Sequence, residues 1–85
     1  MQTLYLDIHH HTDGLTAQVI ECLHVKDLET QDKYGVKYLK SWFDERRGKV
    51  FCLVEAPSKE AAIAVHREAH GLVADELIEV QEGKL

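Results

Sequence analysis

The sequence is poor in the residues that mark specialised architectures, with one proline, five glycines and two cysteines among 85 residues. Cys22 and Cys52 lie far apart with no CxxC spacing, which argues against a structural zinc site and a disulfide scaffold, and we expect two buried free thiols. No apolar run reaches about 18 residues, the length of a membrane-spanning helix. The first residues lack the basic and apolar regions of a signal peptide. We therefore expect a cytoplasmic protein without a membrane segment.

Basic residues are also few and scattered. Lysine and arginine number 10 against 15 aspartates and glutamates, and the net charge is −5. A surface for nucleic acid or anionic membrane needs clustered positive charge, so we expect neither partner. The composition, 45% hydrophobic and 29% charged, is typical of a globular chain, and the length predicts a single domain over residues 1–85. A core of this size is modest, so association with a partner would stabilise it.

Apolar periodicity and turn signals predict four strands and two helices. Thr16 is a candidate N-cap of the first helix, and Ser58, with Glu60 nearby, starts the second. Gly35 and Gly71 are candidate left-handed caps at the helix ends. A hairpin turn is expected over residues 44–48. The predicted strands cover residues 4–9, 36–43, 49–55 and 75–81, and the predicted helices cover residues 16–34 and 58–71.

The predicted order βαββαβ is the ferredoxin-like arrangement, an α+β fold. Right-handed crossovers give a four-stranded antiparallel sheet in the order 4-1-3-2, with both helices on one face. The residues expected to face the helices are Leu4, Leu6, Ile8, Val50, Cys52 and Val54. The opposite face is expected to carry Tyr5, Phe51, Leu53, Tyr38 and Trp42. A face this apolar predicts a homodimer joined sheet to sheet.

Five of the six histidines fall into two groups, His9-His10-His11 after the first strand and His66 with His70 on the second helix. The predicted topology brings both groups to the same end of the domain. Imidazole is the commonest metal ligand among side chains, and histidines at i and i+4 share one helix face. We therefore predict a site for a divalent transition metal ion, with the candidate ligands His9, His10, His11, His66, His70, Asp7, Asp75 and Glu76.

Strand alternation places His9 and His11 on one face with Asp7, and His10 on the helix side. Neutral imidazoles with carboxylates and water form a nitrogen and oxygen shell, which suits nickel, with zinc and copper as alternatives. Either histidine group alone has an ordinary explanation, as a solvated strand end or as the polar border of a helix. His24, Asp27 and Gln31 share one face of the first helix, which favours a hydrogen-bonded polar stripe over a pocket lining. His24 is not expected to be a ligand.

The chain also carries segments typical of one family: Leu6-Asp7-Ile8-His9-His10-His11, Asp27-Leu28-Glu29, Gln31, Tyr34-Gly35-Val36, Trp42, Lys49-Val50-Phe51-Cys52-Leu53-Val54-Glu55-Ala56-Pro57 and His66-Arg67-Glu68-Ala69-His70-Gly71-Leu72. With these segments the chain resembles, over residues 4–80, a small bacterial family of ferredoxin-like proteins that includes a streptomycete nickel-binding protein. The resemblance implies a ferredoxin-like homodimer and nickel binding. The candidate ligands rest on the predicted topology and not on the family.

The favoured interpretation is a cytoplasmic homodimer that sequesters or senses nickel. One alternative is a small dimeric enzyme of the oxygenase or isomerase type, which this fold commonly hosts. Its pocket, between sheet and helices, would be lined by His24, Tyr38, Trp42 and Cys52, with a histidine as general base. No nucleophile, base and orienting residue can be read from the sequence, so an enzyme is less favoured. A second alternative is a protein-interaction module that uses the apolar sheet face.

Overall fold

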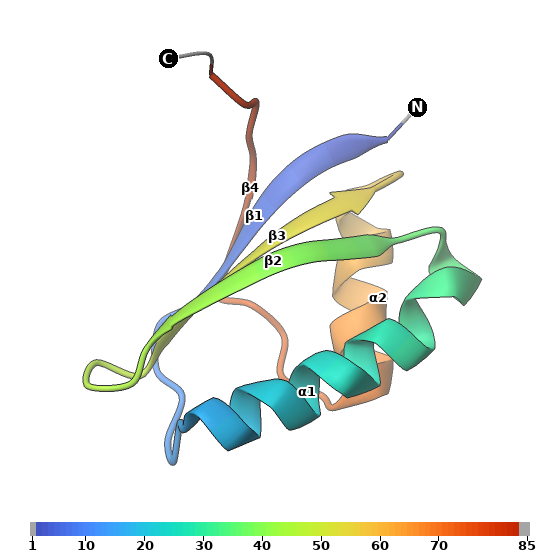
Figure 1. The fold of residues 1–85 in the computed structure, drawn as a ribbon. Coiled ribbons are helices and arrows are strands. Elements are labelled where there is room, and N and C mark those ends of the chain that lie inside the picture. The colour runs from blue at the N-terminus through green and yellow to red at the C-terminus, as the bar shows by residue number, and fades with distance from the viewer. Residues whose placement is uncertain (1, 84–85) are drawn as a thin grey trace.

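The computed structural model describes residues 2–83 as one four-stranded antiparallel sheet with two helices on one side (Figure 1). The sheet order is β2-β3-β1-β4, which confirms the predicted ferredoxin-like topology. Neither helix in this part of the chain has the length and apolar character needed to cross a membrane. The elements are β1 (Thr3–His9), α1 (Ala17–Thr30), the 3-10 helix η1 (Gln31–Tyr34), β2 (Lys37–Asp44), β3 (Lys49–Ala56), α2 (Lys59–Ala69) and β4 (Glu76–Glu79).

The helix ends follow the predicted capping signals. The hydroxyl of Thr16 accepts a hydrogen bond from the Val19 amide at 3.2 Å, and the hydroxyl of Ser58 accepts one from the Ala61 amide at 3.2 Å. Gly35 ends the first helical region with a left-handed φ of 68°. The last turn before Gly35 is a 3-10 helix and not a continuation of α1, because helices commonly tighten at their ends.

The prediction for the two faces of β1 was wrong. Tyr5 and Asp7 are buried against the helices, and they pair with the buried residues Val54 and Cys52 of β3. Leu4, Leu6 and Ile8 lie on the opposite, open face. The apolar alternation therefore indicated the wrong side, because the carboxylate of Asp7 is held inside by His66 of α2 rather than by water.

A bulge in β2 explains a second difference from the prediction, that Tyr38 and Trp42 lie on opposite faces of the sheet. The pairing of β2 with β3 shifts between Tyr38 and Lys40. Without this irregularity Tyr38 and Trp42 would share a face, as the sequence predicted, because strand side chains alternate with a period of two. The bulge instead turns Tyr38 into the core, where it is 5% exposed, and leaves Trp42 on the open face, 50% exposed.

The core lies between the sheet and the helices, with Val54, Ala56, Ala62 and Val65 almost completely buried. No element among residues 2–83 covers the other face of the sheet (Figure 1). Cys52 belongs to the core, as predicted, but Cys22 is exposed on α1, so the prediction of two buried thiols was wrong for Cys22. The apolar side chains of the open face are Leu4, Leu6, Ile8, Trp42, Phe51, Leu53 and Ile78.

Candidate metal centre

His66 is the centre of a buried polar cluster between the sheet and the helices. Its side chain is 3% exposed. Its Nε2 lies 2.6 Å from Asp7 Oδ2, and its Nδ1 lies 2.8 Å from Asp27 Oδ1. Because carboxylates only accept hydrogen bonds, both ring nitrogens donate, and the ring is a cation in the metal-free protein. Tyr38 stacks on this ring at a centroid distance of 4.7 Å, and its hydroxyl donates to the Ala62 carbonyl at 3.1 Å.

Four residues form what we call the inner group: Asp7, His9, Cys52 and His66. Their ligand atoms all lie within 4.8 Å of one another, a spacing at which one metal ion can be held. His9 Nε2 lies 3.3 Å from Asp7 Oδ1, and the His9 side chain is 12% exposed. The group is assembled from β1, β3 and α2, so it forms only when the sheet and the second helix are packed together.

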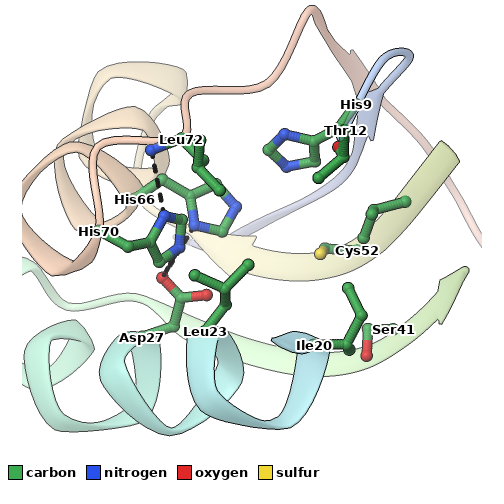
Figure 2. A pocket seen from close by; sticks show the side chains of 11 residues that line it. His9, Thr12, Ile20, Leu23, Asp27, Ser41, Cys52, His66, His70 and Leu72 are labelled. Atoms are coloured by element: carbon green, nitrogen blue, oxygen red, sulfur yellow. Dashed lines mark hydrogen bonds and ion pairs between the residues drawn. The ribbon is translucent and has the colours of Figure 1, made fainter. Parts of the chain in front are cut away.

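A second set, which we call the helix group, consists of Asp27, His66 and His70. His70 Nε2 lies 3.1 Å from Asp27 Oδ1. Its ring also packs against that of His66, with 4.9 Å between the centroids. Figure 2 shows His66 and His70 side by side above Asp27. His66 therefore belongs to both groups, as the candidate ligand that the sheet side and the helix side share.

Buried charge shifts the pKa values of this cluster. Burial alone would raise the pKa of the Asp7 carboxyl, but its contacts with His66 and His9 lower it to about 2. Burial would likewise lower the pKa of His66, but hydrogen bonds to Asp27 and Asp7 raise it to about 11. Burial raises the pKa of the Cys52 thiol to about 11, so this thiol is protonated at neutral pH in the metal-free protein.

Two buried atoms of the cluster have no hydrogen-bond partner among the described residues: Asp7 Oδ1 and His70 Nε2. The nearest groups, His9 Nε2 and Asp27 Oδ1, are close but poorly aligned for a hydrogen bond. Buried polar atoms are satisfied in most folded proteins, so each exception requires an explanation. Coordination by a metal ion is one way to satisfy a buried atom of this kind, and the donor set of imidazole, carboxylate and thiolate fits a transition metal.

A cavity of about 30 Å³ borders the cluster. This is room for a water molecule or an ion beside the side chains. Figure 2 shows the side chains that line it, with His66, His70 and Asp27 close together and Ile20, Leu23 and Leu72 among the apolar ones. Thr12 also lines it, and its amide donates to the Gly48 carbonyl at 2.9 Å. Gly48 has a left-handed φ of 68°, and a side chain there would also put a Cβ 3.1 Å from the Thr12 carbonyl oxygen, so this position favours glycine.

The structure places the candidate ligands predicted from the sequence in two regions, some in the buried cluster and the others at the surface. It brings Asp7, His9, His66 and His70 into the buried cluster, as the predicted topology required. His10 does not point to the helix side as predicted, because its ring contacts Glu76 and Lys49 at the surface. The His10 amide donates to the Asp75 carboxylate at 2.7 Å. We call His10, Asp75 and Glu76 the surface group. His11 is exposed.

Two members of the buried cluster, Asp27 and Cys52, were not among the predicted ligands. Asp27 is 4% exposed, so the polar-stripe interpretation of this residue was wrong. The sequence did contain a signal for the burial of Asp27. This residue lies on the same helix face as the buried Ile20 and the pocket-lining Leu23, at a position where an apolar residue is expected. Of the four residues expected to line an enzyme pocket, only Cys52 lines this cavity. His24, Tyr38 and Trp42 do not.

Comparison with known proteins shows which family this chain belongs to. The family described as nickel responsive protein SCO4226-like matches residues 5–80. The crystal structure of SCO4226 from Streptomyces coelicolor A3(2) is similar to this fold, with a TM-score of 0.89 and 33% sequence identity. The match covers 95% of this chain and 99% of that chain. None of the curated proteins that were compared matches significantly. The chain therefore belongs to the nickel-responsive SCO4226-like family.

Proposed function

We propose that this protein binds nickel ions at the inner group and thereby sequesters or senses nickel in the cytoplasm. The observation that carries the proposal is the convergence of the four donor residues of the inner group, His66 among them, with one oxygen of Asp7 lacking a hydrogen-bond partner. A buried carboxylate oxygen without a partner is unfavourable, and metal coordination is a direct way to satisfy it. Membership of a nickel-responsive family supports the choice of metal.

The identity of the metal does not follow from affinity alone. In most nitrogen and oxygen sites copper binds at least as tightly as nickel, and zinc binds well. The donor set of the inner group accepts all three ions. The burial of Asp7, Cys52 and His66 supports a role in holding an ion away from solvent, because no open face of the metal would be presented to a large substrate. This favours sequestration or sensing over catalysis.

Replacing His9 by alanine should weaken nickel binding by on the order of tenfold or more, because even second-shell losses at metal sites have effects of this size. Binding by wild type should also weaken between about pH 7.5 and about pH 5.5, because protons compete for the imidazole ligands. Isothermal titration of nickel into protein without an affinity tag measures both effects.

The matched control is His11→Ala, which removes an exposed imidazole two residues away. We expect this variant to bind nickel as wild type does. A second control is His24→Ala, because His24 lies outside both donor groups. If His11→Ala weakens binding as much as His9→Ala does, the ion sits at the surface and the inner group is not the site. If wild type does not bind nickel, the proposed function is wrong.

We also propose that the protein is a homodimer, joined through the open face of the sheet. This face differs from the predicted one, because it carries Leu4, Leu6 and Ile8 in place of Tyr5. Trp42 and Ile78 on it are 50% and 43% exposed. A sheet face is covered in most domains, since one uncovered apolar layer is unfavourable in water. A second copy of the same face is an apolar partner of matching size.

Leu6→Lys should convert the homodimer to a monomer, because it places a charge in the middle of the apolar open face. Sedimentation equilibrium at micromolar concentration measures the mass. The control is Val25→Lys on α1, at a position that is 51% exposed and far from the sheet face, and it should remain dimeric. A wild-type mass equal to one chain would contradict the homodimer and favour an interaction module for another protein.

A further inference from the structure

The buried cavity beside the cluster has a neighbour at the surface. An outer pocket of about 420 Å³ lies between the loop after β1, the helix α1 and the segment that follows α2. The residues that line both the outer pocket and the buried cavity are His9, Thr12, Leu23 and Leu72. We call these four residues the neck, because they separate the inner space from the outer one. A molecule that moves from the outer pocket to the Cys52 thiol passes between them.

Three of the four neck residues are held in place by the fold. His9 is the last residue of β1 and is paired with β3. Leu23 lies in the middle of α1. The Thr12 amide donates to a carbonyl of the hairpin between β2 and β3 at 2.9 Å. Leu72, in contrast, belongs to a segment without regular secondary structure, residues 71–74. Leu72 is therefore the neck residue that moves at the lowest cost in free energy.

The segment 71–74 is anchored at both ends. At one end the Gly71 amide donates to a carbonyl of the last turn of α2 at 2.8 Å, with a left-handed φ of 80° at this glycine. At the other end the Asp75 amide donates to a β1 carbonyl at 2.9 Å. Between the anchors the Leu72 amide donates to His70 Nδ1 at 3.1 Å, which Figure 2 draws as a dashed line. Leu72 can therefore swing outward with the loss of this hydrogen bond while both anchors stay in place.

The side chain of Leu72 is placed as a lid would be. It lines the buried cavity on one side and the outer pocket on the other, and the residue is 43% exposed. The cavity behind it measures about 30 Å³, which is room for a water molecule. A larger molecule cannot reach the Cys52 thiol unless the neck widens. The neck thus sets an upper size for what enters.

We propose that Leu72 is a gate residue: the segment 71–74 opens and closes as a lid, and its opening controls which molecules reach the Cys52 thiol from solvent. The closed lid admits molecules of about the size of water and excludes bulky disulfides and electrophiles. This proposal concerns access to the cavity and is independent of what the cluster binds.

The test measures how fast Cys52 reacts with two thiol reagents of different size in metal-free Cys22→Ser protein. The small reagent is methyl methanethiosulfonate, and the large one is dithiobis(nitrobenzoate). Because Cys22 is exposed, its removal leaves Cys52 as the reacting thiol. When the lid moves faster than the thiol reacts, the rate measures the population of the open lid. A Cys52→Ser protein, which keeps Cys22, gives the ratio of the two rates at a thiol without a gate.

We expect the large reagent to be disfavoured at Cys52 relative to Cys22. Leu72→Ala should raise the rate of the large reagent at Cys52 by roughly fivefold to tenfold, because part of the apolar burial that favours the closed lid is lost. The rate of the small reagent should rise less. A change in the ionisation of the thiol would instead speed both reagents by the same factor, so equal acceleration of the two would overturn the gate.

Three variants serve as controls. Leu72→Met, which conserves volume, should react as the parent protein does. So should Val19→Ala, which shortens another apolar side chain of the outer pocket outside the neck. Val65→Ala lowers global stability and lines neither pocket, so it shows how fast Cys52 reacts through global unfolding.

Two further results would overturn the gate. One is a rate in Leu72→Ala no higher than that in Val19→Ala. The other is an acceleration no larger than the loss in the free energy of unfolding predicts, since Cys52 would then react only in the unfolded chain. The experiment contains no nickel, so its failure leaves the proposed function untouched.

Discussion

Replacing His66 with alanine should abolish the rise in melting temperature that we expect from the proposed nickel binding, and should destabilise the metal-free protein by about 3–5 kcal/mol. The reason is that Asp7 and Asp27, which are 1% and 4% exposed, would lose the cation that both of them contact. Binding to the folded state raises stability by mass action, so loss of the shared ligand removes this gain as well. Thermal and urea unfolding, with and without nickel, measure the two effects.

Val65→Ala is the matched control for lost packing. Val65 is completely buried and precedes His66 on α2. Its truncation leaves a cavity and lowers stability, but the nickel-dependent rise in melting temperature should persist. If His66→Ala retains that rise while its fold is intact by circular dichroism, His66 is not a ligand. If it destabilises no more than Val65→Ala does, the charged cluster contributes little to the fold.

The stability of the metal-free protein should fall as the pH rises above about 6.5, the pKa of an unperturbed histidine. The pKa of His66 is raised to about 11 in the folded state, so the folded chain keeps a proton that the unfolded chain has lost. Stability from this group is fully present below about pH 6.5 and declines by up to about 1.4 kcal/mol per pH unit above it. Urea unfolding in the presence of a chelator measures the decline.

At acidic pH the contribution of Asp7 to stability changes with pH in the opposite direction. The pKa of Asp7 is lowered to about 2, so its contribution is present above the unfolded value near 3.8 and is lost as the pH falls through 2. The pH dependence of stability between about pH 6.5 and about pH 8.5 reports mainly on His66. The other buried group with a raised pKa is the Cys52 thiol, and an unperturbed thiol in the unfolded chain titrates only near the upper limit of this interval. His66→Gln should show no decline there, whereas His24→Ala should follow wild type. A flat profile in wild type would contradict the ion-paired cluster.

Topology was predictable from local signals. The caps at Thr16 and Ser58, the glycine after the first helix and the 44–48 hairpin divide the chain into the right elements. The handedness of the crossovers then brings His9 to His66, and the ring centroids lie 5.3 Å apart. The convergence of the two histidine groups followed from chain direction alone and required no knowledge of side-chain packing.

The direction of the β1 side chains was not predictable from the same signals. Alternation defines two faces but does not say which one meets the helices, and the more apolar set was the natural choice. The partners that hold Asp7 inside, His9 and His66, include one far along the chain. The bulge near Leu39 likewise has no local signature, since no glycine or proline marks it. Such features depend on long-range pairing.

The alternation of β1 has a consequence for folding. Leu4, Leu6 and Ile8 are more hydrophobic than Tyr5, Asp7 and His9, so a slip of β1 by one residue would offer an ordinary aliphatic core. The native alignment forgoes that burial and gathers the ionisable side chains instead. Two alignments of one strand therefore compete on the energy landscape, and this conflict between local hydrophobicity and native structure is frustration in the sense used for folding. It arises because the residues of the proposed metal centre occupy the positions that an unspecialised domain fills with aliphatic side chains.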